Sequence, residues 1–139
     1  MVHVRRKMVD EEGHPVSRKG PWKKKCDVVF SELIKYRDGW RCVETKARHN
    51  LQTAHVISRS YLATRWNMDN AVTLTAGRHV WYTHNPLEWR EFCLKRLGKE
   101  RYEELEKKAR ARRKWTVPEL KELYAELTDK LEALRPSGR

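Results

Sequence analysis

Long apolar runs and paired cysteines are both scarce in this sequence. No uncharged apolar stretch among the 139 residues is long enough to span a bilayer, and the N-terminus lacks the continuous apolar segment of a secretory signal. The three cysteines are odd in number and far apart, which argues against a disulfide framework. We therefore expect a soluble, intracellular protein with reduced thiols and no membrane association.

Acidic residues are also few relative to basic ones. The chain has 31 lysines and arginines against 19 aspartates and glutamates, which gives a formal net charge of +12. This excess goes beyond what solubility requires and favours a polyanionic partner. Because such charge binds phosphate backbones of any sequence, it does not distinguish DNA from RNA or from an anionic membrane.

The length allows one compact domain with extensions. Residues 1–25 mix charges with glycine and proline and show no apolar period, which predicts a flexible basic arm. Residues 26–98 form the predicted core, and residues 99–139 form a C-terminal helical extension for DNA binding or dimerisation. The patterns within the core predict a helix over 27–37 with Asp27 as N-cap, antiparallel strands over 51–57 and 71–75, and a helix over 86–97 capped by Asn85.

Two helices are predicted in the extension, over residues 101–113 and from about residue 117 to 134. Thr116 would cap the second helix, and Glu119 would complete a capping box. One face of that helix carries an apolar stripe: Leu120, Leu123, Tyr124, Leu127, Leu131 and Leu134. Such a stripe needs a partner, which is either the preceding helix in a hairpin or a second copy of the chain in a homodimer.

Three residues carry the chemistry of this sequence: His55, Asn70 and His79, in the order H-x14-N-x8-H. A single histidine is usually a packed or surface residue. Three such residues on a predicted strand, a return strand and the approach to a helix resemble the HNH nucleases. That resemblance implies an α+β fold with a ββα-metal (His-Me finger) core, preceded by an N-terminal helix and followed by the helical extension.

The resemblance extends to a branch of that superfamily. From about Asp27 to Arg135 the chain is similar to the NinG (Rap) family of phage recombination nucleases. The residues that carry this similarity are Arg37, Asp38, Cys42, Ala54, His55, Arg65, Asn70, Leu97, Gly98, Lys114, Trp115, Thr116 and the segment 131–135. The family implies a junction-resolving endodeoxyribonuclease that cuts Holliday junctions and other branched DNA. It also implies the cytoplasm of a bacterial host, with nucleoid association if a phage encodes the protein.

The zinc-binding pattern of the family is not kept. Related HNH proteins hold a structural zinc with two CxxC pairs, because four thiolates make a closed tetrahedral site. Here Cys42 remains, while Thr45, Thr75 and Arg78 stand where the other thiols are expected. We therefore expect no structural zinc. Trp40, Val72, Leu74 and Trp81 would brace the core instead, with an ion pair between Glu44 and Arg78.

The resemblance implies one divalent metal ion, Mg²⁺ or Mn²⁺, with Zn²⁺ as an alternative. Many HNH enzymes place a metal ligand just before the general base, where this chain has Ala54. His79 is then the best candidate ligand, and His84 and Asp69 are supplements. His84 could equally belong to the start of the next helix or contact a phosphate.

The candidate catalytic residues follow from the same resemblance. His55 would be the general base that activates water, because imidazole titrates near neutral pH. Asn70 would fix the loop that carries His55. The metal would stabilise the charge that develops on the phosphate, and the products would carry 5′-phosphate and 3′-hydroxyl ends.

Basic residues would hold the DNA. Arg59 and Arg65 lie in the connection between the strands, where they could clamp a phosphate or remain solvated loop charges. The remaining candidates for a backbone track are Lys23, Lys24, Lys25, Lys108, Arg110, Arg112, Arg113 and Lys114. No base-reading helix is evident, so these contacts would set affinity and not sequence choice.

Three other functions are compatible with the sequence. A general HNH nicking or double-strand endonuclease, tied to phage packaging or defence, would show the same motif. A binding module that kept the fold and lost the reaction would explain the missing thiols and Ala54. An RNA-binding protein related to translation would explain the charge but would leave the H-N-H spacing to chance.

Overall fold

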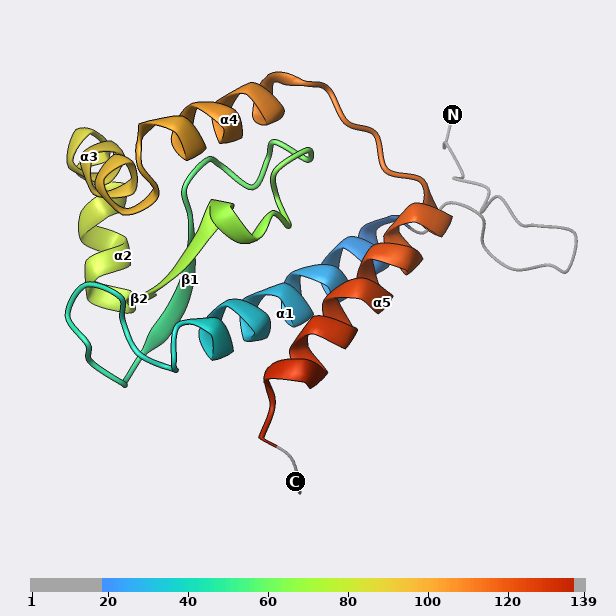
Figure 1. Ribbon diagram of the computed structural model, residues 1–139, viewed down its shortest axis with the longest axis horizontal. Coiled ribbons are helices and arrows are strands. Elements are labelled where there is room, and N and C mark those ends of the chain that lie inside the picture. The colour runs from blue at the N-terminus through green and yellow to red at the C-terminus, as the bar shows by residue number, and fades with distance from the viewer. Residues whose placement is uncertain (1–18, 137–139) are drawn as a thin grey trace, which may run out of the picture.

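The computed structural model describes residues 19–136, and its two-stranded antiparallel sheet is surrounded by helices (Figure 1). In chain order the elements are α1 (Lys19–Arg37), β1 (Leu51–His55), the 3-10 helix η1 (Met68–Asn70), β2 (Ala71–Thr75), α2 (Ala76–Thr83), α3 (Pro86–Leu97), α4 (Lys99–Arg110) and α5 (Val117–Leu134). This mixed architecture confirms the predicted α+β class. Two strands are followed directly by a helix.

The hairpin lies at the centre of the molecule. Its register pairs Leu51 with Thr75 at one end and His55 with Ala71 at the other. Strand β2 has the predicted bounds and is buried over Ala71–Leu74, whereas β1 ends at His55 and does not continue to residue 57. The pairing of β1 stops there because the chain turns away into the loop that runs to η1.

Helix α1 is longer than the sequence predicts. It begins at Lys19, so Asp27 lies inside the helix and is not its N-cap. The last part of the predicted flexible arm is therefore helical, and residues 1–18 lie outside the described residues. Tertiary packing explains the difference, because the added turns place Trp22 edge-on against Tyr124 of α5, with 5.8 Å between the ring centroids.

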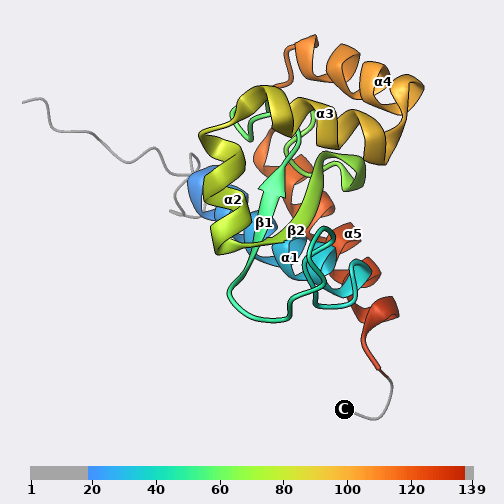
Figure 2. The ribbon, with the colours of Figure 1, turned by 90° about the vertical axis from the view of Figure 1, so that its left-hand side faces the viewer.

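The apolar stripe of α5 packs against α1. Leu120, Leu127 and Leu131 are buried there together with Phe30 and Leu33 of α1. The two helices lie side by side in both ribbon views (Figures 1 and 2), and α4 does not cover the stripe. The stripe is thus used within one chain, by a helix distant in sequence and not by the preceding one. The predicted extension completes the core of the domain.

The capping predictions are confirmed at one helix and wrong at another. Thr116 and Glu119 form the predicted capping box at the start of α5. Helix α3 has the predicted bounds, but the Asn85 side chain does not cap it and donates instead to the carbonyl of Trp81. Helix α4 covers residues 99–110 and ends three residues before the predicted 113, because the chain extends from Ala111 to reach α5.

Helix α2 was not predicted. It starts directly after β2, where the Thr75 hydroxyl accepts the backbone N–H of Arg78 at 3.3 Å. His79 therefore lies within a helix, and not in a loop before the next one. A helix of eight residues carries too short an apolar pattern to stand out in the sequence, and the cap at Thr75 is the signal that could have revealed it.

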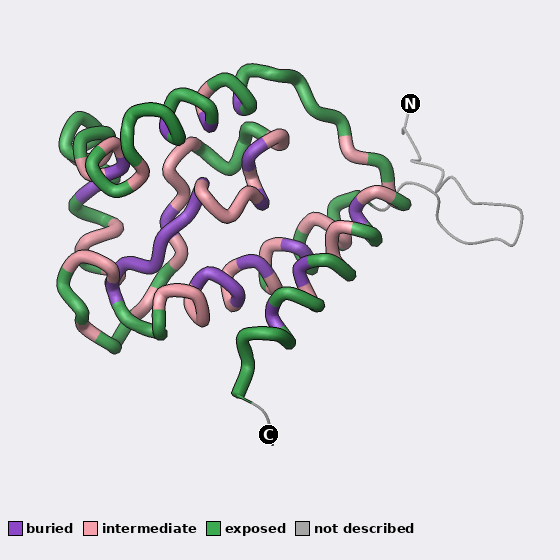
Figure 3. Tube along the Cα trace, in the orientation of Figure 1, coloured by how far each residue is buried: buried purple, intermediate pink, exposed green. Residues whose placement is uncertain are grey.

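A second cluster of buried side chains lies on the other side of the hairpin and includes Cys42, Ala54, Val72, Leu74 and Tyr82. Figure 3 shows the buried positions running through the hairpin and the facing sides of the helices.

Two bracing predictions for this cluster differ in outcome. The ion pair between Glu44 and Arg78 is confirmed, with 2.5 Å between Oε1 and Nε. Trp40 and Trp81 are 40% and 41% exposed, so they do not brace the core as predicted.

The packing of α5 on α1 predicts a position-dependent loss of stability. Replacing buried Leu127 by alanine should lower the free energy of unfolding by about 2–5 kcal/mol, because it leaves a cavity. Leu134, on the same stripe but 46% exposed, is the control, and Leu134→Ala should change stability by less than about 0.5 kcal/mol. Urea unfolding followed by circular dichroism measures both. Equal losses would contradict the observed packing.

Candidate functional site

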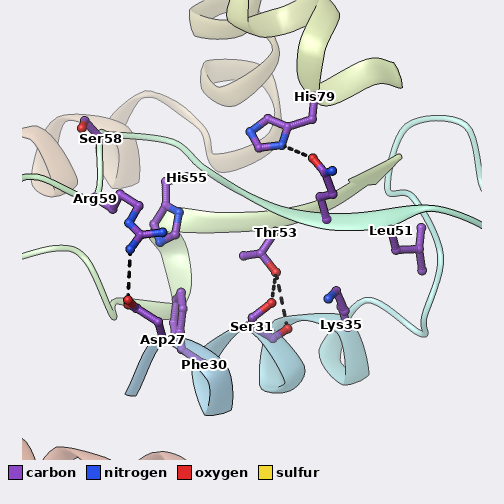
Figure 4. Close-up of a pocket in the computed structure, with 11 residues that line it drawn as sticks. Asp27, Phe30, Ser31, Lys35, Leu51, Thr53, His55, Ser58, Arg59 and His79 are labelled. Carbon is purple, nitrogen blue, oxygen red and sulfur yellow. Dashed lines mark hydrogen bonds and ion pairs between the residues drawn. The ribbon is translucent and has the colours of Figure 1, made fainter. Parts of the chain in front are cut away.

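An open hollow of about 490 Å³ lies between α1, β1 and the start of α2 (Figure 4). We call it the His55 hollow. Its lining includes Asp27, Ser31 and Lys35 from α1, His55 from β1, Arg59 from the following loop and His79 from α2. Both histidines of the motif therefore reach one hollow, although the chain places 23 residues between them.

His55 stands at the end of β1 with a defined protonation pattern. Its Nε2 lies 3.1 Å from the backbone carbonyl oxygen of Arg65, and its ring lies 5.9 Å from the ring of Phe30. Because a carbonyl only accepts, Nε2 donates and, in the neutral ring, Nδ1 carries the lone pair. Burial lowers the pKa of His55, although the Arg65 carbonyl partly opposes this shift. The neutral ring is therefore favoured near pH 7, with Nδ1 able to accept a proton.

Asn70 holds the loop that follows His55. Its side chain is fully buried, and its Oδ1 accepts the backbone N–H of Ile57 at 2.8 Å. Its Nδ2 donates to the carbonyls of Ile57 at 3.1 Å and Thr64 at 3.0 Å. The amide thus ties both ends of the loop to the start of β2. The same loop leads to Arg65, whose carbonyl orients the His55 ring.

His79 approaches the hollow from the other side of the strand. Its Nδ1 lies 2.7 Å from Oε1 of Gln52. Because side chains alternate along β1, Gln52 points to the opposite face of the strand from His55. Figure 4 shows the His79 ring on the α2 side of β1 and the His55 ring on the α1 side. Burial lowers the pKa of His79 as well. The two imidazoles line one hollow from opposite faces of β1.

The predicted metal ligands are not brought together. Asp69 pairs with Arg101 of α4 and lines other hollows beside η1, whereas His84 is exposed at the C-terminal end of α2. Within residues 19–136, no three His, Cys, Asp or Glu side chains form a group that could hold a metal ion. Of the described side chains, the one hydrogen-bonded to the His79 ring is the Gln52 amide, and no carboxylate among them is bonded to that ring. Because Mg²⁺ usually binds one or two carboxylates, these side chains do not fit a resident Mg²⁺ or Mn²⁺ centre.

Arg59 and Arg65 differ in how they are used. Arg65 donates to both carboxylate oxygens of Asp27, at 3.0 and 2.5 Å, and its side chain is only 15% exposed. Arg59 reaches Asp27 through one nitrogen at 3.1 Å and is 60% exposed. Trp66 donates to the same carboxylate at 2.9 Å. Arg65 is therefore part of the structure, and Arg59 is the arginine that can bind a phosphate in the hollow.

The other predicted DNA contacts lie on ordered backbone. Lys23, Lys24 and Lys25 belong to α1, and Lys25 sits over the ring of Trp22 at 4.4 Å. Lys108 and Arg110 belong to the last turn of α4, and Arg112, Arg113 and Lys114 are exposed in the segment that leads to α5. Trp115 anchors that segment, because its Nε1 donates to the carbonyl of Leu62 at 3.0 Å. The cations are thus held in place and are not carried on a mobile arm.

Among the residues of the hollow that the sequence did not predict as site residues are Ser31, Lys35 and Gln52. Two of them follow Asp27 at intervals of four residues, the spacing that places side chains on one face of a helix. That signal was available once α1 was predicted. Gln52 carried no signal, because its role depends on contact with His79 across the sheet.

The lowered pKa of His55 predicts a pH dependence of stability. Below about pH 6.5 the unfolded chain binds a proton at this histidine, whereas the folded protein resists it, so acid favours unfolding. The free energy of unfolding should therefore fall less between about pH 7.5 and about pH 5 in His55→Gln than in wild type. Urea unfolding at both pH values measures this difference. Equal falls in the free energy of unfolding in the two proteins would contradict a lowered pKa of His55, since the carboxylates contribute alike to both proteins.

The two arginines on Asp27 predict different effects on stability. Arg65→Ala should lower the free energy of unfolding by about 1–3 kcal/mol, because it removes two hydrogen bonds from a half-buried carboxylate. Arg59→Ala should lower it by less than about 0.5 kcal/mol, because its ion pair is exposed. Urea unfolding followed by circular dichroism measures both variants. An unchanged stability in Arg65→Ala, or an equal loss in Arg59→Ala, would reverse the assignment.

The site therefore combines a neutral imidazole, a buried asparagine that positions its loop, and exposed cations around an open hollow. None of the helices within residues 19–136 has both the length and the apolar character needed to cross a bilayer. Comparison of the chain with protein-family models, with curated proteins and with solved structures gave no match.

Proposed function

We propose that this protein is an endonuclease of the HNH type that hydrolyses phosphodiesters in DNA. The observation that carries the proposal is the state of His55 at the edge of a cationic hollow. Its Nε2 is engaged by the Arg65 carbonyl at 3.1 Å, which leaves the Nδ1 lone pair for proton transfer. The order of two strands and a helix, with His55 at the end of β1, Asn70 directly before β2 and His79 in α2, agrees with such an enzyme.

In the proposed reaction, His55 acts as the general base. Its Nδ1 accepts a proton from a water molecule, and the resulting hydroxide attacks phosphorus opposite the 3′ oxygen. The bond between phosphorus and that oxygen breaks, and the departing oxygen takes a proton from solvent water to become the 3′-hydroxyl. Arg59 and Lys35 bind the phosphate and offset its negative charge. Asn70 is a positioning residue, because it fixes the loop whose Arg65 carbonyl orients the base. We assign no step to a metal ion, since the side chains around His79 do not complete a site for one.

The preferred substrate in this proposal is branched DNA. The support is the family resemblance, together with exposed lysines and arginines of the kind that bind phosphates without reading bases. A general nicking or double-strand endonuclease would have the same hollow. Cleavage of a four-way junction, a flap and a linear duplex separates the two, because a generalist cuts all three at similar rates.

A catalytic assay tests the proposal. Labelled junction, flap and duplex DNA are incubated with wild type, His55→Ala and His84→Ala, each with Mg²⁺, Mn²⁺, Zn²⁺ or EDTA. His84→Ala is the matched control, because His84 is exposed and lies outside the lining of the hollow. We expect His55→Ala to lose about 100- to 10,000-fold in rate, as for removal of a general base, with the control unchanged. Products should carry 5′-phosphate ends.

Two outcomes would contradict the proposal, the first at its active site and the second at its activity. If His55→Ala cuts as fast as wild type, the hollow is not the active site. If wild type binds DNA but cuts nothing under any of the four conditions, the protein is a DNA-binding relative without activity. One observation favours this second candidate, the DNA-binding relative without activity. Ala54 stands where a metal ligand is expected, and it is buried in the core beside Val72.

A further inference from the structure

We propose that DNA bound in the His55 hollow continues past Lys35 to Trp40 as an unpaired segment, with one base stacked on the Trp40 ring. The inference deepens the proposed function, on which its choice of DNA as ligand rests. It adds a second contact beyond the hollow and assigns the substrate a stretch of unpaired nucleotides.

The face of α1 leads from one site to the other. Asp27, Ser31 and Lys35 line the hollow at intervals of four residues, which spans about 12 Å along a helix. The Nζ of Lys35 lies 5.8 Å from the centre of the Trp40 ring. A strand whose phosphate is bound at Arg59 and His55 can therefore follow α1 and meet the tryptophan just beyond its end.

Trp40 is held in an unusual way for a partly exposed tryptophan. The end of α1 is closed by two hydrogen bonds, from the N–H of Gly39 to Tyr36 and from the N–H of Trp40 to Lys35, at 3.1 and 2.8 Å. Gly39 takes the left-handed conformation that this closure needs, with φ 72°. Trp40 also has a positive φ, of 54°, which is strained for a bulky residue and is not required of it by the closure.

The ring itself is fixed but not covered. It meets the ring of Tyr36 edge-on, with 5.4 Å between centroids and 86° between planes, while the residue remains 40% exposed. The contact with Tyr36 is the usual packing of an apolar residue at this position against the last helical turn, and it leaves part of the ring accessible. A strained backbone that keeps an aromatic ring at the surface is consistent with a stacking platform, since base stacking on aromatic side chains needs an accessible ring.

The charges around Trp40 suit a phosphate backbone. Arg41, Lys46 and Arg48 are exposed in the segment between α1 and β1, and Arg48 donates to the carbonyl of Gly39 at 3.3 Å. The acidic groups of this segment are already paired, because Asp38 bonds Arg37 and Glu44 bonds Arg78. Cations thus flank the ring on the side of Lys35 and on the side of Arg48.

Unpaired DNA is the ligand that fits both features. In a duplex the faces of the bases are stacked inside, where a side chain on the surface of a globular protein does not reach them. In a single-stranded stretch they are free, and stacking on an aromatic ring tolerates any base. Branched substrates present such stretches at junctions and flaps.

Binding measurements in EDTA test the inference without requiring cleavage. A fluorescein-labelled single strand, its duplex and an RNA of the same sequence are titrated with wild type, Trp40→Ala and Trp40→Phe, with anisotropy as the readout. We expect Trp40→Ala to weaken single-strand binding by about 5- to 150-fold and duplex binding by less than about 2-fold. We expect Trp40→Phe, which keeps an aromatic ring, to lose less of the single-strand affinity than Trp40→Ala. A single strand carrying 2-aminopurine should be quenched by wild type and not by Trp40→Ala.

Trp81→Ala is the matched control. Trp81 is exposed to the same extent, at 41%, but lies on α2 with Arg78 over its ring at 4.6 Å. We expect it to leave single-strand binding unchanged. An equal loss on single strand and duplex in Trp40→Ala, no loss at all, or tighter binding of RNA than of DNA would overturn the inference. Selective binding without any cleavage by wild type would uphold the inference and reject the enzyme.

Discussion

The site depends on one carboxylate. Asp27, in the middle of α1, accepts hydrogen bonds from Arg65, Arg59 and Trp66, all in the loop between the strands. This network fixes the loop against the helix, and the carbonyl of Arg65 then reaches Nε2 of His55. A half-buried carboxylate with three donors is stable because its charge is matched, whereas the same group without Arg65 would lose its bidentate partner. Asp27 therefore orients the His55 imidazole indirectly, through the loop that carries Arg65.

The second cluster shows how the hairpin and α2 hold together at the positions where the resembled family binds zinc. The Cys42 sulfur accepts the backbone N–H of Thr45 at 3.4 Å, and the Thr75 hydroxyl accepts that of Arg78 at 3.3 Å, so two similar turns face each other. Glu44 joins them, since it binds Arg78 through two contacts and also accepts the hydroxyl of Tyr82. These hydrogen bonds lower the pKa of Glu44, which keeps the carboxylate charged. An ion pair and a phenol thus connect segments that a shared metal could otherwise have joined.

The charge of the hollow is set by the residues around the two histidines more than by the histidines themselves. Among the described residues that line it, the one carboxylate, on Asp27, is neutralised by two arginines, and Lys35 adds a cation from the same helix. Further exposed basic residues lie on α1 and on the segment after α4. His79 and His55 stand on opposite faces of β1 and line the same hollow.

Local patterns were sufficient for the elements whose signals lie within a few residues. The bounds of β2 and α3 and the capping box of Thr116 and Glu119 are as predicted, because β-branched residues between turns, proline and capping groups act over a few residues. The tertiary structure decided the rest: the start of α1, the helix that carries His79, the separation of Asp69 from that histidine, and the partner of the α5 stripe. The sequence by itself determined which residues could do chemistry and where short elements begin. Only packing between distant segments decided which of those residues meet, since each such contact depends on the surface that another element happens to present.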